Sequence, residues 1–214
     1  MPSDCAQKLI DDVVDIGLIP VAATLNLPQW EIVSNYCIGA VGAVNSVFIF
    51  SNCAVEDIKY LQLDPESRSS NSLALVLLKN FWKINPELVN NTPCYGLSTE
   101  ANTAFVQIGD RTFGKKEKYK YAYDLAEEWQ KFTGLPFMFA GWIANKPIPQ
   151  EFMDEFNAAL KYGLDHRHEL FKEITMRDDF DIMDYLMVKI DFELTEDKKK
   201  ALFMFLDLIT RLQD

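Results

Sequence analysis

The 214-residue sequence has few of the residues and patterns that mark the common classes of enzyme. Its two histidines, His166 and His168, stand two residues apart and do not share a helical face, which indicates an exposed polar helix and not a metal site. So little histidine argues against a Ser-His-Asp or Cys-His nucleophile system. Neither a GxGxxG pattern nor a P-loop is present, so we expect no nucleotide cofactor and no metal.

Long apolar runs and a leader peptide are absent as well. The best run, residues 38–50, is shorter than the roughly 18 residues of a membrane span, and the N-terminus lacks the basic and apolar regions of a signal peptide. The four cysteines, Cys5, Cys37, Cys53 and Cys94, have no CxxC spacing, which indicates thiols in a reducing compartment. We therefore expect a cytoplasmic protein that does not enter a membrane.

Basic charge is also scarce, with 21 Lys and Arg residues against 32 Asp and Glu residues and a net charge of −11. This balance argues against nucleic acid and anionic membrane surfaces as partners. A small anionic ligand needs local donors instead, and backbone N–H groups at a helix N-terminus are the usual ones.

The sequence does contain enough apolar residues, 49%, to form a proper core. Residues 106–144 show the clearest order of elements: a strand that ends at Gly109-Asp110-Arg111, a helix, and a second strand. Gly134 and Pro136 mark the end of that helix. The apolar run 137–144 is typical of a strand buried on both faces, as in a parallel α/β sheet.

Other segments extend this α/β pattern. A helix is expected after Ser3, and Thr195 is expected to cap the last helix. Expected strands are residues 14–19, 30–33, 36–38, 47–51 and 58–63. Residues 152–160, 182–190 and 202–212 show apolar spacing typical of helices.

Three polar positions are candidates for a ligand site. The serine-rich segment 67–72 lies between a strand and a helix, where Ser69, Ser70 and Asn71 are placed to bind a carboxylate; a single serine that caps the helix explains it about equally well. Gly109-Asp110 either presents donors at the sheet edge or forms an ordinary turn. Asn45-Ser46, just before a strand, is open to the same two interpretations.

Several motifs in this chain resemble one known family, the chorismate dehydratases of the futalosine route to menaquinone. The matching segments are 108–111 (IGDR), 123–129 (YDLAEEW), 133–140 (TGLPFMFA), 15–22 (DIGLIPVA), 42–47 (GAVNSV) and 67–70 (SRSS). They occur in the family's order along nearly the whole chain.

The resemblance implies a two-lobed fold like that of type II periplasmic binding proteins, with the ligand in the cleft. Residues 1–52 and 136–214 are then the first lobe and residues 53–135 the second, with crossings near Ser51 and Leu135. The family pattern opens with a strand, a helix and a second strand, including a loop with a catalytic Asn, that are missing here. We expect this segment upstream of residue 1, and a chain without it is expected to be incomplete as a catalyst.

The resemblance also implies a reaction, the loss of water from chorismate to give 3-[(1-carboxyvinyl)oxy]benzoate. Ser46 matches the family's cleft serine, and Ser69, Ser70 and Asn71 match its carboxylate clamp, while Gly109 and Asp110 lie on the cleft. The sister dihydroxynaphthoate synthase carries a His where Gly109 stands here, which favours the dehydratase. A non-catalytic module that binds a small carboxylate is the remaining alternative.

Overall fold

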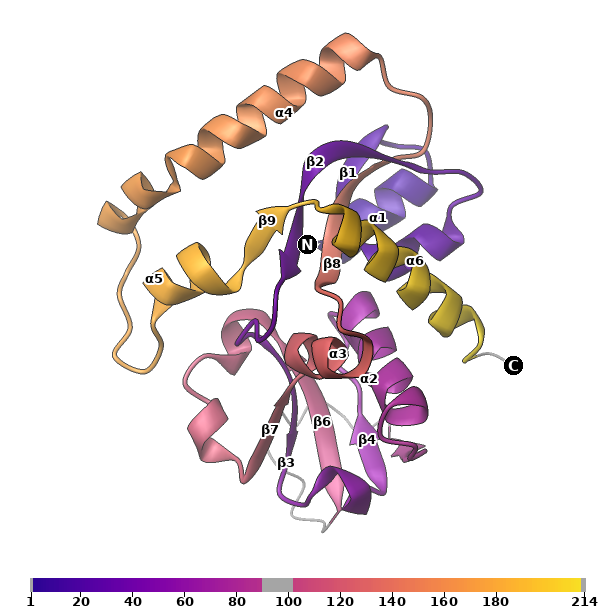
Figure 1. Ribbon diagram of the computed structural model, residues 1–214, viewed down its shortest axis with the longest axis vertical. Helices are drawn as coiled ribbons and strands as arrows, with labels where there is room; N and C mark the ends of the chain where they lie inside the picture. Colours follow the sequence, from indigo (N-terminus) through magenta and orange to yellow (C-terminus); the bar gives the residue numbers. More distant parts are fainter. Residues whose placement is uncertain (1, 90–101, 213–214) are drawn as a thin grey trace.

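A computed structural model describes residues 2–89 and 102–212, and it forms two lobes that each surround one β-sheet (Figure 1). The helices are α1 (Pro2–Ile10), α2 (Arg68–Asn80), α3 (Leu125–Thr133), α4 (Gln150–Asp165), α5 (Ile182–Asp184) and α6 (Glu196–Thr210). The strands are β1 (Ile16–Pro20), β2 (Glu31–Ala40), β3 (Val47–Ser51), β4 (Tyr60–Gln62), β5 (Glu87–Leu88), β6 (Thr103–Ile108), β7 (Tyr121–Asp124), β8 (Phe137–Ala144) and β9 (Asp191–Glu193). Short helical turns are η1 (Val21–Asn26), η2 (Val55–Asp57), η3 (Gly109–Thr112), η4 (Lys116–Lys118), η5 (Arg167–Lys172) and η6 (Tyr185–Lys189).

The first lobe contains a four-stranded sheet in the order β1-β8-β2-β9. Its inner strand β8 is buried along most of its length, as its apolar run predicts. Both neighbours, β1 and β2, run antiparallel to β8, so the expected parallel arrangement is wrong here. An apolar run predicts that a strand is buried on both faces, but it does not predict whether the neighbouring strands run parallel or antiparallel to it. Helix α1 packs against β1, and α6 packs against β8.

The second lobe contains a five-stranded mixed sheet in the order β5-β4-β6-β3-β7. Strand β3 is antiparallel to both of its neighbours, while β4 is parallel to β5 and β6. One face packs against α2 and α3, with Ile49, Leu73 and Trp129 in the core. The other face carries a separate aromatic cluster formed by Phe48, Phe50 and Phe105 with Tyr119 against it. Both faces are thus occupied.

The position of β3 corrects the expected lobe boundary. Strand β3 was expected in the first lobe, with the first crossing near Ser51, but it pairs with β6 and β7 in the second sheet. The chain therefore first crosses between Ala40 and Val47. The return crossing lies between α3 and β8, next to Leu135 as expected. The two crossing segments lie side by side at the middle of the molecule (Figure 1).

Local chemistry places several element ends. Gly134 has a φ of 74° and ends α3, and the Thr195 hydroxyl accepts a hydrogen bond from Lys198 N at the start of α6, so both predicted caps are confirmed. The expected strands 30–33 and 36–38 are parts of one strand, β2, which carries a register shift in its pairing with β8. Strands β7 and β9 were not predicted.

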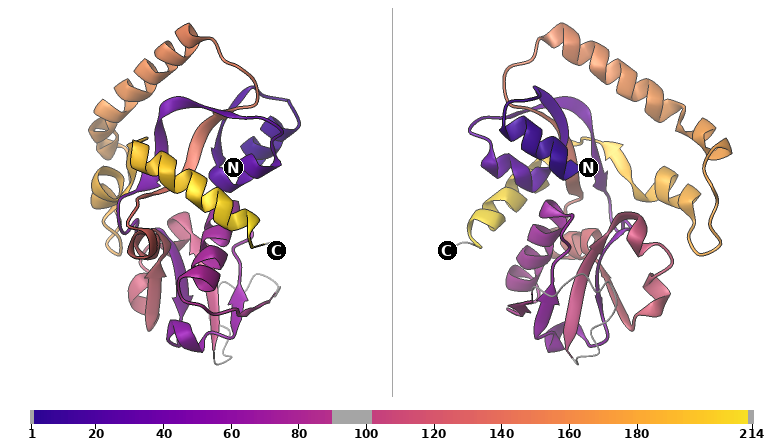
Figure 2. Two further views of the ribbon diagram at one scale, coloured as in Figure 1. Left: turned by 45° about the vertical axis from the view of Figure 1, so that its right-hand side comes forward. Right: turned by 180° about the vertical axis from the view of Figure 1, so that it is seen from behind.

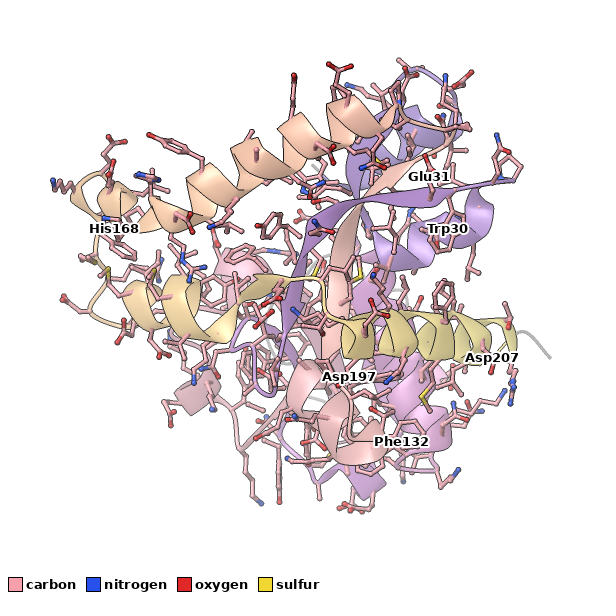
Figure 3. All side chains as sticks on the ribbon, turned by 45° about the horizontal axis from the view of Figure 1, so that its top comes forward. Trp30, Glu31, Phe132, His168, Asp197 and Asp207 are labelled. Atoms are coloured by element: carbon pink, nitrogen blue, oxygen red, sulfur yellow. The ribbon has the colours of Figure 1, made fainter. Side chains whose placement is uncertain are left out.

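Residues 150–190 form a helical arm that connects β8 to β9. No residue of α4 is buried, and Phe152 is 47% exposed, although its spacing with Phe156 predicted a packed face. Asn157 attaches α4 to β2, because its Oδ1 accepts hydrogen bonds from Ser34 Oγ at 3.0 Å and Asn35 N at 2.7 Å. Helix α4 extends beyond the first sheet (Figure 2), and His168 lies near its far end (Figure 3).

Lys198 holds the end of the arm against the first sheet. Its side chain is fully buried, and its Nζ donates to the backbone oxygens of Asp191 at 3.1 Å and Glu193 at 2.6 Å and pairs with the Asp191 carboxylate. A fully buried lysine is tolerated only with such partners. Lys198 therefore joins α6 to β9.

Replacing Lys198 by Met is expected to lower the free energy of unfolding by about 3 kcal/mol, since the two carbonyls and the Asp191 carboxylate lose their donor. Urea unfolding followed by circular dichroism measures this change. The control is Lys200→Met on the exposed side of α6, where the expected change is below about 0.5 kcal/mol. Equal effects of the two substitutions would contradict this role.

Cys37 lies on β2 and is 2% exposed, and burial raises the pKa of its thiol to about 11 from an ordinary value of 9.0. Cys5 and Cys53 are only half-buried, and Cys94 lies outside the described residues. At pH 8 the thiolate fraction of Cys37 falls roughly 100-fold below that of an ordinary thiol, because each pKa unit is a factor of ten.

We therefore expect Cys37 to be the slowest of these three cysteines to react with iodoacetamide in the folded protein. Peptide mass spectrometry after timed alkylation measures the three rates. In urea the three rates are expected to converge, whereas a Cys37 that reacts as fast as Cys53 before unfolding would show that its burial is not maintained.

Candidate functional site

A pocket of about 210 Å³ opens between the second lobe and the helical arm. Asn45, Phe48 and Thr112 line it from the second lobe and the crossing segment, and Phe180 and Tyr185 line it from the arm. Segments far apart in the sequence thus form its two walls. This places the pocket beside Ser46, which the sequence singled out as a candidate.

Ser46 stands between a strained turn and a buried strand. It is 3% exposed, and the residue before it, Asn45, has a left-handed φ of 58°. Its backbone oxygen accepts a hydrogen bond from Gly109 N at 2.8 Å, and its Oγ accepts one from Tyr185 Oη at 3.0 Å. The structure therefore brings Ser46 and Gly109, two separately predicted positions, into direct contact.

The carboxylate of Asp124 holds the turn that precedes Ser46. Its Oδ2 accepts Asn45 N at 2.6 Å, while its Oδ1 accepts Ala126 N at 3.0 Å and Glu127 N at 3.2 Å. One buried side chain thus caps α3 and fixes the crossing segment. Burial raises the pKa of the Asp124 carboxyl, and the backbone N–H groups around it oppose that change.

Asp64 is a second buried carboxylate that holds a distant segment through hydrogen bonds. Its side chain is fully buried; Oδ2 accepts Ile108 N at 3.1 Å, and Arg111 donates to both oxygens at 2.9 Å and 2.8 Å. Sequence reasoning missed Asp64, although an Asp before a Pro at a strand end is a signal for such a turn. Asp64 joins the IGDR segment to the corner at the start of α2.

The serine-rich segment is a helix start and not the loop that was expected. Helix α2 begins at Arg68, and the Ser67 hydroxyl caps it by accepting Ser70 N at 3.1 Å. The Ser69 hydroxyl accepts Ala22 N at 3.1 Å, which links the start of α2 to η1 in the first lobe. Ser69 and Ser70 are both 3% exposed.

The two remaining predicted site residues are Asn71, which bonds to Asp64, and Asp110, which is exposed. Asn71 uses its side-chain amide on the backbone of Asp64, accepting from its N at 2.9 Å and donating to its O at 2.7 Å. Asp110 lies in the first turn of η3 and is exposed, and its charge contributes to the raised pKa of Tyr185. Asn71 thus bonds to Asp64, and Asp64 bonds to Ile108 and Arg111 on either side of Gly109, which in turn bonds to Ser46.

Within residues 2–89 and 102–212, no group of three or more His, Cys, Asp or Glu side chains is placed to hold a metal ion. Of the helices described there, none combines the length and the apolar character needed to cross a membrane. The pocket is lined by carboxylate side chains (Glu117, Asp179, Asp181 and Asp184) and by two lysines, Lys116 and Lys189.

The class of protein follows from comparison with solved structures. The chain is similar to protein AF1704 from Archaeoglobus fulgidus, with a TM-score of 0.73 and 12% identity over 100% of this chain and 84% of the other. It is also similar to an ABC transporter from Parabacteroides distasonis, with a TM-score of 0.61 and 16% identity over 99% of this chain and 79% of the other. A third similar structure is XAC2383 from Xanthomonas citri bound to ATP, with a TM-score of 0.57 and 8% identity over 100% of this chain and 84% of the other. This is a two-lobed α/β fold of the periplasmic-binding-protein type.

The family is more specific than the fold. A family model described as menaquinone biosynthesis matches residues 1–211, so this chain belongs to that family. The resemblance to a menaquinone-pathway protein is thereby confirmed.

Replacing Asp124 by Asn is expected to lower the free energy of unfolding by about 2 kcal/mol. An amide keeps one oxygen for the start of α3, but its NH₂ group then faces the N–H of Asn45, and two donors cannot pair. Urea unfolding with circular dichroism detects the loss.

The matched control is Asp181→Asn, because Asp181 caps the short helix α5 through a single bond to Asp184 N at 2.9 Å. Asn caps a helix about as well as Asp, so the expected change is below about 0.5 kcal/mol. An Asp124→Asn protein as stable as this control would mean that the double attachment does not stabilise the fold.

Proposed function

We propose that this protein is a lyase of menaquinone biosynthesis that dehydrates chorismate to 3-[(1-carboxyvinyl)oxy]benzoate in the futalosine route. The observation that carries the proposal is the position of Ser46, held by Asp124 through its turn and by Gly109 through its backbone, next to a pocket between the arm and the second lobe. The family motifs that include this serine support the same reaction.

Substrate binding in this proposal uses local donors. Chorismate is a dicarboxylate, and the protein carries a net charge of −11, so the overall field repels it. The first turn of α2 offers the backbone N–H of Ser69 and the positive end of the helix dipole to one carboxylate, while the N–H of Ser70 is used by the Ser67 cap. Asn71 supports this corner through Asp64, and we assign Gly109 and Asp110 to the opposite side of the bound substrate.

The chemical step removes a ring proton and the neighbouring hydroxyl as water. The electrons of the broken C–H bond form the last ring double bond while the C–O bond breaks, and aromaticity drives the step. Serines are weak bases, so we assign the role of proton acceptor to a carboxylate of the substrate itself. The two lobes orient and desolvate the substrate, and Ser46 donates a hydrogen bond to the departing hydroxyl.

The direct test is incubation of the protein with chorismate and chromatographic detection of the aromatic product. Ser46→Ala is expected to lower the rate about 100-fold, the usual cost of losing a hydrogen bond to developing charge. Ser34→Ala is a matched control, since Ser34 is also buried but bonds to Asn157 away from the pocket, and its rate is expected to stay within about twofold.

Two results would oppose the proposal in different ways. Chorismate that binds without turnover, detected by tryptophan fluorescence, would favour the non-catalytic binding module. An unchanged rate in Ser46→Ala would remove Ser46 from the mechanism while keeping the reaction.

A further inference from the structure

The site contains a contact that the proposed function does not use. Tyr185 Oη donates a hydrogen bond to Ser46 Oγ at 3.0 Å, although the two residues are 139 positions apart. The tyrosine comes from the arm, whereas the serine comes from the crossing segment. Since a hydroxyl oxygen that accepts one bond still has its own proton, Ser46 is left free to donate in another direction.

Two aromatic rings hold Tyr185 in this position. Phe113 of the second lobe stacks on Phe180 of the arm with centroids 3.7 Å apart and an interplanar angle of 9°. Tyr185 meets both rings edge-on, at 5.3 Å from Phe113 and 5.4 Å from Phe180. Edge-to-face packing of this kind restricts the ring and therefore the direction of its hydroxyl.

The backbone near Tyr185 has an unusual conformation and packs closely against the second lobe. Tyr185 begins a π-helical turn, a rare geometry that often occurs at functional sites. Gly114, with a φ of 67°, lies so close to Asp179 that a Cβ there would overlap the Asp179 side chain. The arm is thus seated on the loop 112–117 with no space for a larger residue.

The surroundings of the phenol favour its protonated form, and burial is the main cause. Burial raises the pKa of Tyr185, and Asp110 at the rim acts in the same direction, while the bond to Ser46 opposes both. The ion pair of Lys189 with Asp184, 3.7 Å apart, lies in the arm on the same pocket, and Lys116 and Glu117 line its other wall. At neutral pH the phenol is therefore a donor.

We infer that Tyr185 is a positioning residue. Its hydroxyl donates a hydrogen bond to the Ser46 oxygen, so that the Ser46 hydroxyl proton points toward the substrate in the pocket. This inference rests on the proposed function and deepens it, because it gives the arm a part in the reaction. Tyr185 itself does not touch the reacting atoms.

Tyr185→Phe removes only the hydroxyl and keeps the three-ring packing. We expect kcat for chorismate dehydration to fall about tenfold, KM to stay within twofold, and the urea midpoint to stay unchanged. Tyr162→Phe is the matched control, because Tyr162 is an exposed tyrosine of α4 outside the pocket, and its kcat is expected to be unaltered.

The double variant decides whether Tyr185 acts through Ser46. In a Ser46→Ala background, Tyr185→Phe is expected to cause no further loss, because the group that it orients is gone. A further tenfold loss there, or an unchanged kcat in Tyr185→Phe alone, would overturn the inference.

A second measurement does not need turnover, so it separates this inference from the proposed function. In a Ser46→Cys protein with ¹³C-labelled cysteine, NMR titration reports the pKa of the introduced thiol. A hydrogen bond from Tyr185 stabilises the thiolate, so adding Tyr185→Phe is expected to raise that pKa by about one unit. Identical thiol pKa values with and without the tyrosine hydroxyl would contradict the contact even if chorismate is not the substrate.

Discussion

The double attachment of the Asp124 carboxylate is the interaction on which the site depends. One oxygen caps α3, and the other holds the amide of Asn45, which has a left-handed conformation. The start of α3, which follows β7, therefore fixes the direction of the turn that leads into β3. Because Ser46 follows that turn directly, and Gly109 bonds to Ser46, this one side chain fixes the position of Ser46 beside the pocket.

Asp64 and Asp124 show how a chain with a charge of −11 can present donors to an anion. Both carboxylates are buried, and both use backbone N–H groups as partners, with Arg111 added at Asp64. Their charges are satisfied inside the protein and do not line the pocket. In the proposed function, the N–H groups at the start of α2 and the hydroxyl of Ser46 are the donors for a carboxylate ligand, because local dipoles can bind an anion without net positive charge.

Local signals in the sequence predicted the elements that depend on local chemistry. The span of β3, the glycine at the end of α3 and the threonine at the start of α6 follow from apolar runs and capping residues. The direction of β8's neighbours and the lobe to which β3 belongs depend on pairing between distant segments, which no local pattern encodes. The same reason explains the site: Ser46 and Gly109 were recognisable one at a time, but the contact of Ser46 with Tyr185 joins residues with no shared motif.

The central claim is that a dicarboxylate binds between the first turn of α2 and Ser46. A crystal structure of this chain with 3-[(1-carboxyvinyl)oxy]benzoate tests it most directly. We predict a carboxylate of the product against the backbone N–H of Ser69 at the start of α2, and its ring beside the Ser46 hydroxyl that Tyr185 orients. Product bound elsewhere on the protein, with neither α2 nor Ser46 in contact with it, would contradict the account.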